Sequence, residues 1–225
     1  TLQPIEVADG SYSRHTLCIG RARELRQLLR GWRRARLGQG GGWLLRGEAG
    51  VGKSCLSETL RRHIASRGGL TLCARCFPEY ENNALSPLLS LLRQHVLAGV
   101  EPVAQIARLT QVLHDAGCDV DRVMPIFCAW LALPFARQDA GAVSPVLQKQ
   151  LLIEALGQWL GHLAQHTPVL LMVEDLHWAD SATLDALHHV AHQLPGQALA
   201  LLMTCRPGAG LEAESVRTLE LARLK

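Results

Sequence analysis

The segment that most constrains this chain spans residues 47–54 and has the sequence GEAGVGKS, which fits the phosphate-loop pattern G-x-x-x-x-G-K-[ST]. It lies between the apolar residues 43–45 and a helix-forming run. Gly47, Gly50 and Gly52 allow a tight turn in which successive backbone N–H groups point at a phosphate chain. An ordinary glycine-rich turn is the alternative, although such a turn does not require every fixed position of the pattern. The segment therefore predicts a strand, a phosphate-binding loop and a helix.

The candidate nucleotide-binding residues of this loop are Gly47, Glu48, Ala49, Gly50, Val51, Gly52, Lys53, Ser54 and Cys55. Lys53 would reach β- and γ-phosphate oxygens, and the Ser54 hydroxyl would be a ligand of Mg²⁺. The helix that follows adds the positive end of its dipole. The expected cofactors are therefore ATP or ADP with Mg²⁺.

A second informative stretch, TPVLLMVED, spans residues 167–175. Its short, continuous apolar run predicts a fully buried parallel strand whose acids emerge at the carboxyl end, where ligands bind in open α/β sheets. One acid would hold Mg²⁺ and the other would polarise the attacking water. We favour Glu174 for the metal and Asp175 for the water, although the alternation of side chains along a strand leaves the order open. A pair of helix-capping acids is the alternative.

Arg206 follows the next predicted strand, residues 198–203, in register with these acids. A guanidinium at this place could report whether a γ-phosphate is present. A surface arginine that closes a strand is the alternative. Thr218–Leu221 is predicted as a last strand.

Composition bounds the possible partners. No apolar run reaches the ~18 residues of a membrane span and no signal peptide is present, so a cytoplasmic protein without membrane contact is expected. The net charge of +3 is too small to imply nucleic acid.

Arginines crowd residues 21–36, with leucines and Trp32 between them at helical spacing, which predicts a helix to about Leu37 with a solvated basic face. Nucleic-acid contact through that face is the less favoured alternative.

The chain order predicts an α/β fold with a helical insertion. Residues 1–18 show no periodicity and form an irregular leading segment, whereas residues 19–225 form the core. Residues 83–137 have a helical pattern without strand alternation, which predicts the insertion, with breaks at Pro87, Pro102, Pro125 and Pro134. Residues 39–42 are expected to be a flexible glycine link into the first strand. Asp180 or Ser181 is expected to cap a helix.

Several motifs together resemble the STAND class of P-loop ATPases, the signal-transduction ATPases with numerous domains. They resemble most closely the ATPase module found beside class III adenylate/guanylate cyclase, protein kinase or DNA-binding domains in bacterial regulators. The resemblance covers nearly the whole chain and is most specific at EDLHWAD. The residues that carry it are Gly20-Arg21 with Glu24-Leu25, GEAGVGKS, CFPEYENNALSPLLSLL, Ser144-Pro145 with Gln148-Lys149, PVLLMVEDLHWADSATLDAL and LLMTCRP.

The resemblance implies a three-layer P-loop core with a central, mainly parallel sheet, whose nucleotide state controls an attached effector domain. It implies that Gly20 and Arg21 lie near the adenine and ribose, and that Arg206 senses the phosphate. It also implies the phosphate and Mg²⁺ roles given above for the loop and the acids. Two departures stand out: Glu174 occupies a position where related ATPases often have Asp, and the lid or winged-helix region expected after the last strand is missing.

The function expected from these features is an ATP-binding, slowly hydrolysing switch, for which a homo-oligomer is one possible assembly. A small-molecule phosphotransferase is one alternative, although the long spacing to Glu174 and a water-positioning acid favour hydrolysis. A nucleotide-dependent DNA-binding or assembly scaffold is the other, and the arginine-rich helix supports it.

Overall fold

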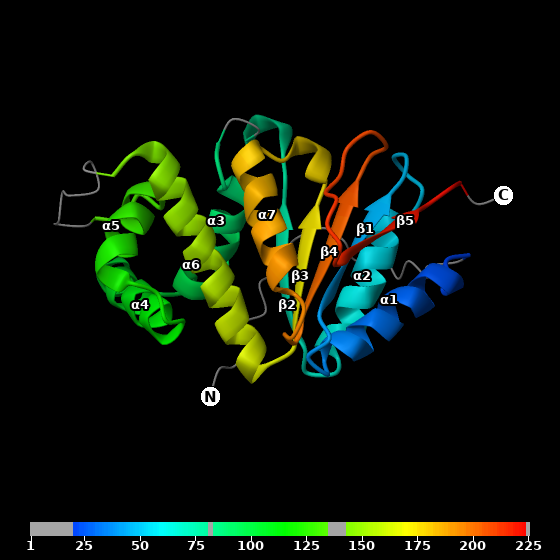
Figure 1. Ribbon diagram of the computed structural model, residues 1–225, viewed down its shortest axis with the longest axis horizontal. Coiled ribbons are helices and arrows are strands. Elements are labelled where there is room, and N and C mark those ends of the chain that lie inside the picture. The colour runs from blue at the N-terminus through cyan, green and yellow to red at the C-terminus, as the bar shows by residue number, and fades with distance from the viewer. Residues whose placement is uncertain (1–19, 81–82, 135–142, 224–225) are drawn as a thin grey trace.

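The computed structural model describes residues 20–80, 83–134 and 143–223 (Figure 1). Five strands form one sheet in the order β2-β3-β4-β1-β5, and all neighbouring strands are parallel. This arrangement confirms the predicted α/β fold with a parallel sheet. The strands are β1 (Gly41–Arg46), β2 (Leu70–Arg75), β3 (Val169–Glu174), β4 (Leu199–Cys205) and β5 (Val216–Glu220).

Helices cover both faces of the sheet, which gives three layers (Figure 1). Helices α4 and α5 lie beyond α6, far from β5. The α-helices are α1 (Ala22–Ala35), α2 (Lys53–Ala65), α3 (Ser86–Leu92), α4 (Pro102–Asp115), α5 (Val120–Trp130), α6 (Pro145–His166) and α7 (Ser181–Gln193). Short elements are the 3₁₀ turns η1 (Pro78–Tyr80) and η4 (Leu176–Trp178) and the π-helix η2 (Arg93–Leu97).

The alternation of side chains along β3 divides the core into two clusters. Leu170 and Met172 pack with residues of α1 and α2, whereas Val169, Leu171 and Val173 pack with residues of α3, α6 and α7. Because alternate residues of a strand share a face, Glu174 lies on the same face of β3 as Leu170 and Met172. The strand therefore directs the first acid toward the α2 side.

The described part of residues 83–137, predicted as a helical insertion, holds α3, η2, α4 and α5. Pro87 and Pro102 lie in the first turns of α3 and α4, where a missing N–H costs little. The predicted break at Pro125 is wrong, because α5 continues through it. One lost backbone hydrogen bond is offset there by the buried side chains of Met124, Ile126 and Phe127.

The predicted flexible glycine link is also wrong. Gln39 forms an isolated bridge with Pro195, and Gly41 already belongs to β1. A Cβ at Gly40 would lie 2.1 Å from the Leu194 carbonyl oxygen, so the glycine permits close packing of two backbones. The segment is therefore fixed against the end of α7 rather than free.

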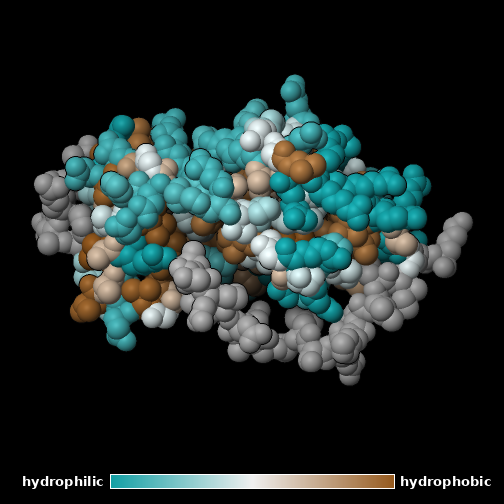
Figure 2. Space-filling model, turned by 90° about the horizontal axis from the view of Figure 1, so that it is seen from below, coloured by the Kyte–Doolittle hydropathy of each residue, from teal (hydrophilic) through white to brown (hydrophobic). Residues whose placement is uncertain are grey.

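Helix α1 has the predicted two-sided character, but it ends at Ala35 and not at Leu37. Leu28, Trp32 and Ala35 are buried. Figure 2 shows hydrophilic side chains over the α1 side of the molecule and hydrophobic patches among α4 and α5. The exposed arginines of this segment are Arg23, Arg26, Arg30, Arg33, Arg34 and Arg36. None of the helices in the described part of the chain has the length and hydropathy that crossing a membrane requires.

Candidate nucleotide site

The phosphate loop joins the end of β1 to the start of α2 and has free space beside two of its glycines. Gly50 and Gly52 have φ angles of 77° and 97°, which residues other than glycine rarely adopt. No atom of the described residues lies within 4 Å of a Cβ placed at either glycine. At Gly47, by contrast, a Cβ would lie 2.7 Å from the Leu221 carbonyl oxygen. The loop is thus anchored at its first glycine and leaves room above the next two.

Lys53 is the buried cation of this loop. Its Nζ donates to the carbonyl oxygens of Gly47 at 2.6 Å and Glu48 at 2.9 Å. Burial lowers the pKa of Lys53, and the charge of Arg206 lowers it further, whereas the charge of Asp175 raises it. A partly desolvated ammonium at the first turn of a helix suits a polyanion such as a phosphate chain.

Ser54 opens the first turn of α2 with an exposed side chain. Glu58 lies one turn further, on the same side of the helix. Burial raises the pKa of Glu174, and the negative charges of Asp175 and Glu58 raise it too, while Arg75 lowers it. Glu174 therefore lies within electrostatic reach of the α2 side that carries Ser54.

This donor set fits Mg²⁺, which binds through few protein ligands plus phosphate oxygens and water. Across residues 20–80, 83–134 and 143–223, no three His, Cys, Asp or Glu residues converge on one point as a preformed metal cage would. One hydroxyl at Ser54 and one carboxylate at Glu174 would be the protein's contribution to such an ion.

Asp175 has a special backbone and two specific contacts. Its φ of 57° places it in the left-handed region, which is unusual for a residue other than glycine. Its N–H donates to Thr204 Oγ1 at 3.0 Å, and its Oδ2 accepts from Arg75 Nε at 3.0 Å and Arg75 Nη2 at 2.9 Å. Asp175 is thereby tied to β2 through its carboxylate and to β4 through its backbone N–H.

Sequence reasoning missed Arg75 and Thr204. Both residues lie at the ends of strands, but their place beside the acids needed the strand order, because only the parallel pairing of β2 and β3 places Arg75 opposite Glu174. A polar residue at the carboxyl end of each parallel strand meets its neighbours at one edge of the sheet.

Arg206 directly follows β4 and is exposed. Its charge lowers the pKa of Lys53 and also that of His177, whose pKa is lowered mainly by burial. Both ring nitrogens of His177 are buried without a hydrogen-bond partner among the described residues. The structure therefore brings Lys53, Asp175 and Arg206 to the same edge of the sheet.

Gly20 and Arg21 were expected near the adenine and ribose. Arg21 is only 5% exposed, and its guanidinium donates to Glu24 Oε1 at 3.1 Å, to the Val51 carbonyl at 2.9 Å and to the Ala222 carbonyl. It thus ties the phosphate loop to the chain after β5. A contact of Arg21 with a nucleotide remains a prediction.

The expected cap of α7 is Asp180. Its Oδ1 accepts from the Thr183 N–H at 2.9 Å and from the Leu85 N–H at 3.3 Å. The loop after β3 is therefore bonded to the start of α3.

The proteins similar to this chain include a curated relative and a distant solved structure. An uncharacterized protein of Rhizobium meliloti (strain 1021) is 27% identical over 195 residues, which are 86% of this chain. The chain spans only 19% of that relative's length. The solved structure is the plasmid coupling protein TrwB in complex with the non-hydrolysable GTP analogue GDPNP. It is 13% identical over 77% of this chain and 65% of that chain, and its TM-score of 0.32 is too low to carry an argument.

The family comparison covers most of the chain. A model described as AAA ATPase domain matches residues 17–203, a span that holds the phosphate loop, both strand-end acids and β4 up to its last residues. The buried Lys53 in the glycine loop and the nearby charge of Asp175 are what a P-loop ATPase core requires, and the chain belongs to the AAA ATPase domain family.

Proposed function

We propose that this chain is an ATP-binding, slowly hydrolysing switch module of the STAND class, which controls an effector domain attached outside these residues. The observation that carries the proposal is the buried Lys53 under an open glycine loop, with the charges of Asp175 and Arg206 acting on it. The small share of the Rhizobium relative that the chain spans suits a module of a longer regulator. A cyclase, kinase or DNA-binding domain as effector, and a homo-oligomeric assembly, belong to the same proposal.

Glu174 and Asp175 have different charged neighbours, and these neighbours suggest a different role for each acid. Asp175 already has a cation, because Arg75 binds its carboxylate. Glu174 faces the negative charges of Asp175 and Glu58 as well as Arg75, so a divalent cation would relieve its electrostatic cost. We assign Glu174, with Ser54, to Mg²⁺ and Asp175 to the attacking water. Arg206 is assigned to the γ-phosphate.

Slow turnover follows from contacts that must change before the acids can act. Lys53 is bonded to two loop carbonyls and Asp175 to Arg75, and a bound triphosphate must compete for both groups. Each exchange is a conformational step of the kind that limits turnover in many enzymes. Such a site suits a regulator whose bound state lasts.

Calorimetry with ATP and ADP in the presence of Mg²⁺ tests the binding site. Lys53→Ala should weaken ATP binding by at least about 100-fold, or roughly 2.7 kcal/mol, since it removes the charge beneath the phosphates. Lys149→Ala on α6 is the matched control and should bind normally. Unchanged affinity in Lys53→Ala would overturn the proposal.

Phosphate release tests the assignment of the acids. Asp175→Asn should bind ATP but turn over at least about 100-fold more slowly. Glu174→Gln should mainly weaken the dependence of binding on Mg²⁺. Wild-type turnover in Asp175→Asn contradicts its role. A fast turnover that appears only with a small alcohol or nucleoside acceptor would favour a phosphotransferase instead.

A nucleotide-dependent DNA-binding scaffold is the second candidate, favoured by the exposed arginines of α1. Simultaneous replacement of Arg30, Arg33 and Arg34 by Ala should abolish any salt-dependent DNA affinity if this scaffold exists. ATP binding measured on the same variant should stay unchanged in either case.

A further inference from the structure

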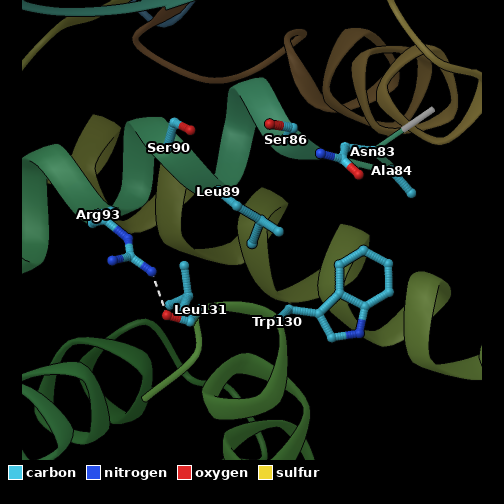
Figure 3. A pocket seen from close by; sticks show the side chains of 8 residues that line it. All are labelled: Asn83, Ala84, Ser86, Leu89, Ser90, Arg93, Trp130 and Leu131. Atoms are coloured by element: carbon cyan, nitrogen blue, oxygen red, sulfur yellow. Dashed lines mark hydrogen bonds between the residues drawn. The ribbon is translucent and has the colours of Figure 1, made fainter. Parts of the chain in front are cut away.

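A cavity of about 410 Å³ opens between α3 and the end of α5, away from the phosphate loop (Figure 3). The side chains that define its chemistry are Asn83, Ser86, Leu89, Ser90, Arg93 and Trp130. This volume is within the range of small-molecule sites, roughly 300–1,000 Å³. None of these residues belongs to the nucleotide site.

The two ends of the cavity differ in chemistry. Arg93 and Trp130 lie at opposite ends, with Leu89 between them (Figure 3). The indole Nε1 of Trp130 donates to Gln148 Oε1 at 3.3 Å, which fixes the ring. One nitrogen of Arg93 donates to the Leu131 carbonyl, and the rest of this exposed guanidinium makes no further hydrogen bond or ion pair with the described residues. One end therefore offers charge and the other an aromatic surface.

The described lining favours an anionic ligand. The described residues that line the cavity include one cation and neutral hydroxyl and amide groups, and no carboxylate. We propose that this cavity binds a small organic anion with an aromatic ring, whose carboxylate pairs with Arg93 and whose ring packs on Trp130. The hydroxyls of Ser86 and Ser90 supply further polar contacts along its length.

The backbone around the cavity departs from relaxed geometry. Leu85 and Ala132 have φ angles of 59° and 51°, and both adjoin lining residues. The π-helix η2 begins at Arg93 itself. Left-handed residues other than glycine and π-helical turns are both common at ligand sites, because surrounding contacts must hold them in place. These features support a built site rather than an accidental gap.

The start of α3, which forms part of the cavity wall, is also bonded to the loop that follows the acids of β3. The Leu85 N–H donates to Asp180, which caps α7 and lies five residues after Asp175. A ligand that displaces the start of α3 would therefore act on the loop after β3. This coupling, unlike the binding itself, rests on the proposed ATPase function.

Calorimetry without nucleotide tests the binding, with naphthalene-2-carboxylate and its uncharged carboxamide as probes. The carboxylate should bind with a Kd below about 1 mM, and the carboxamide at least about tenfold more weakly, the loss expected for one charged hydrogen-bonding contact. Arg93→Gln should weaken the carboxylate about tenfold and leave the carboxamide unchanged. Arg108→Gln, an exposed position on α4, is the matched control and should bind both probes normally.

A second variant separates binding from folding. Ser90→Leu fills the cavity while Arg93 stays, and it should block both probes with little change in Tm. Absence of carboxylate binding, equal affinity for both probes, or binding that survives in Arg93→Gln and Ser90→Leu would each overturn the proposal. Binding that Lys53→Ala abolishes would place the probe at the nucleotide site and overturn it as well.

ATP turnover tests the coupling separately. Saturating carboxylate should change turnover in the wild type and leave Arg93→Gln unaffected. Tight binding without any change in turnover would overturn the coupling alone, and a wild-type chain without turnover would instead count against the proposed function.

Discussion

The two faces of the sheet have different tasks. The face that holds Leu171 packs under α6 and α7, in a cluster that continues through α3, α4 and α5. The face that holds Leu170 packs under α1 and α2 only, yet it carries the helix of the phosphate loop and the side of β3 that ends in Glu174. Most of the apolar burial and most of the proposed chemistry thus lie on opposite faces.

Neighbouring leucines of β3 give the sharpest test of this comparison, because both are fully buried. Leu171→Ala should lower the free energy of unfolding by about 3–5 kcal/mol, since its cavity lies within the larger cluster. Leu170→Ala should cost about 2–3 kcal/mol and also weaken ATP binding, because α2 rests on it. Denaturant unfolding and calorimetry measure both effects, and a greater loss of stability in Leu170→Ala would break the comparison.

Substitution of Arg21, on the face covered by α1 and α2, should give the next largest loss of stability. Arg21→Gln removes donors from the carbonyls of Val51 and Ala222 and should cost about 1–3 kcal/mol in the free energy of unfolding. Arg23→Gln, an exposed neighbour, should stay within about 0.5 kcal/mol. Equal effects of the two substitutions would show that the buried contacts of Arg21 add nothing.

Thr204 tests the carboxyl ends of the strands, where it bonds Asp175. Thr204→Val removes the acceptor of the Asp175 N–H and should cost about 1 kcal/mol of stability. Turnover should fall more than ATP affinity, because Asp175 loses its orientation. Thr204→Ser keeps the hydroxyl and should restore turnover; failure to do so would mean that the methyl group matters instead.

The smallest effect is expected outside both clusters, on the exposed side of α1. Arg30→Gln should change the free energy of unfolding by no more than about 0.5 kcal/mol. Thermal unfolding at low and high salt checks this, and a loss above 1 kcal/mol would reveal a contact that the exposed side chain does not show.

Local patterns in the sequence predicted most of the fold. The run at residues 167–175 and the loop at 47–54 each carry their signal within about ten residues, because strand burial and phosphate binding are local demands. The helix at Pro145–His166 has a similarly local signal, since its proline and the preceding serine mark the start. These features placed the sheet, the loop and both acids.

Contacts between distant segments could not be read in the same way. Arg75 and Asp175 are 100 residues apart, and Arg21 and Ala222 are 201 residues apart. Pro125 and the glycines at 40–42 were misread for a related reason: tertiary packing overrides the local preference of proline and glycine. Positions of side chains at the strand ends needed the strand order.

The guanidinium of Arg21 has a mechanical consequence. It holds the Val51 carbonyl of the phosphate loop and the Ala222 carbonyl at the same time. Tension on the residues after β5 is therefore transmitted to the phosphate loop through this planar side chain, in addition to the backbone pairing of β5 with β1.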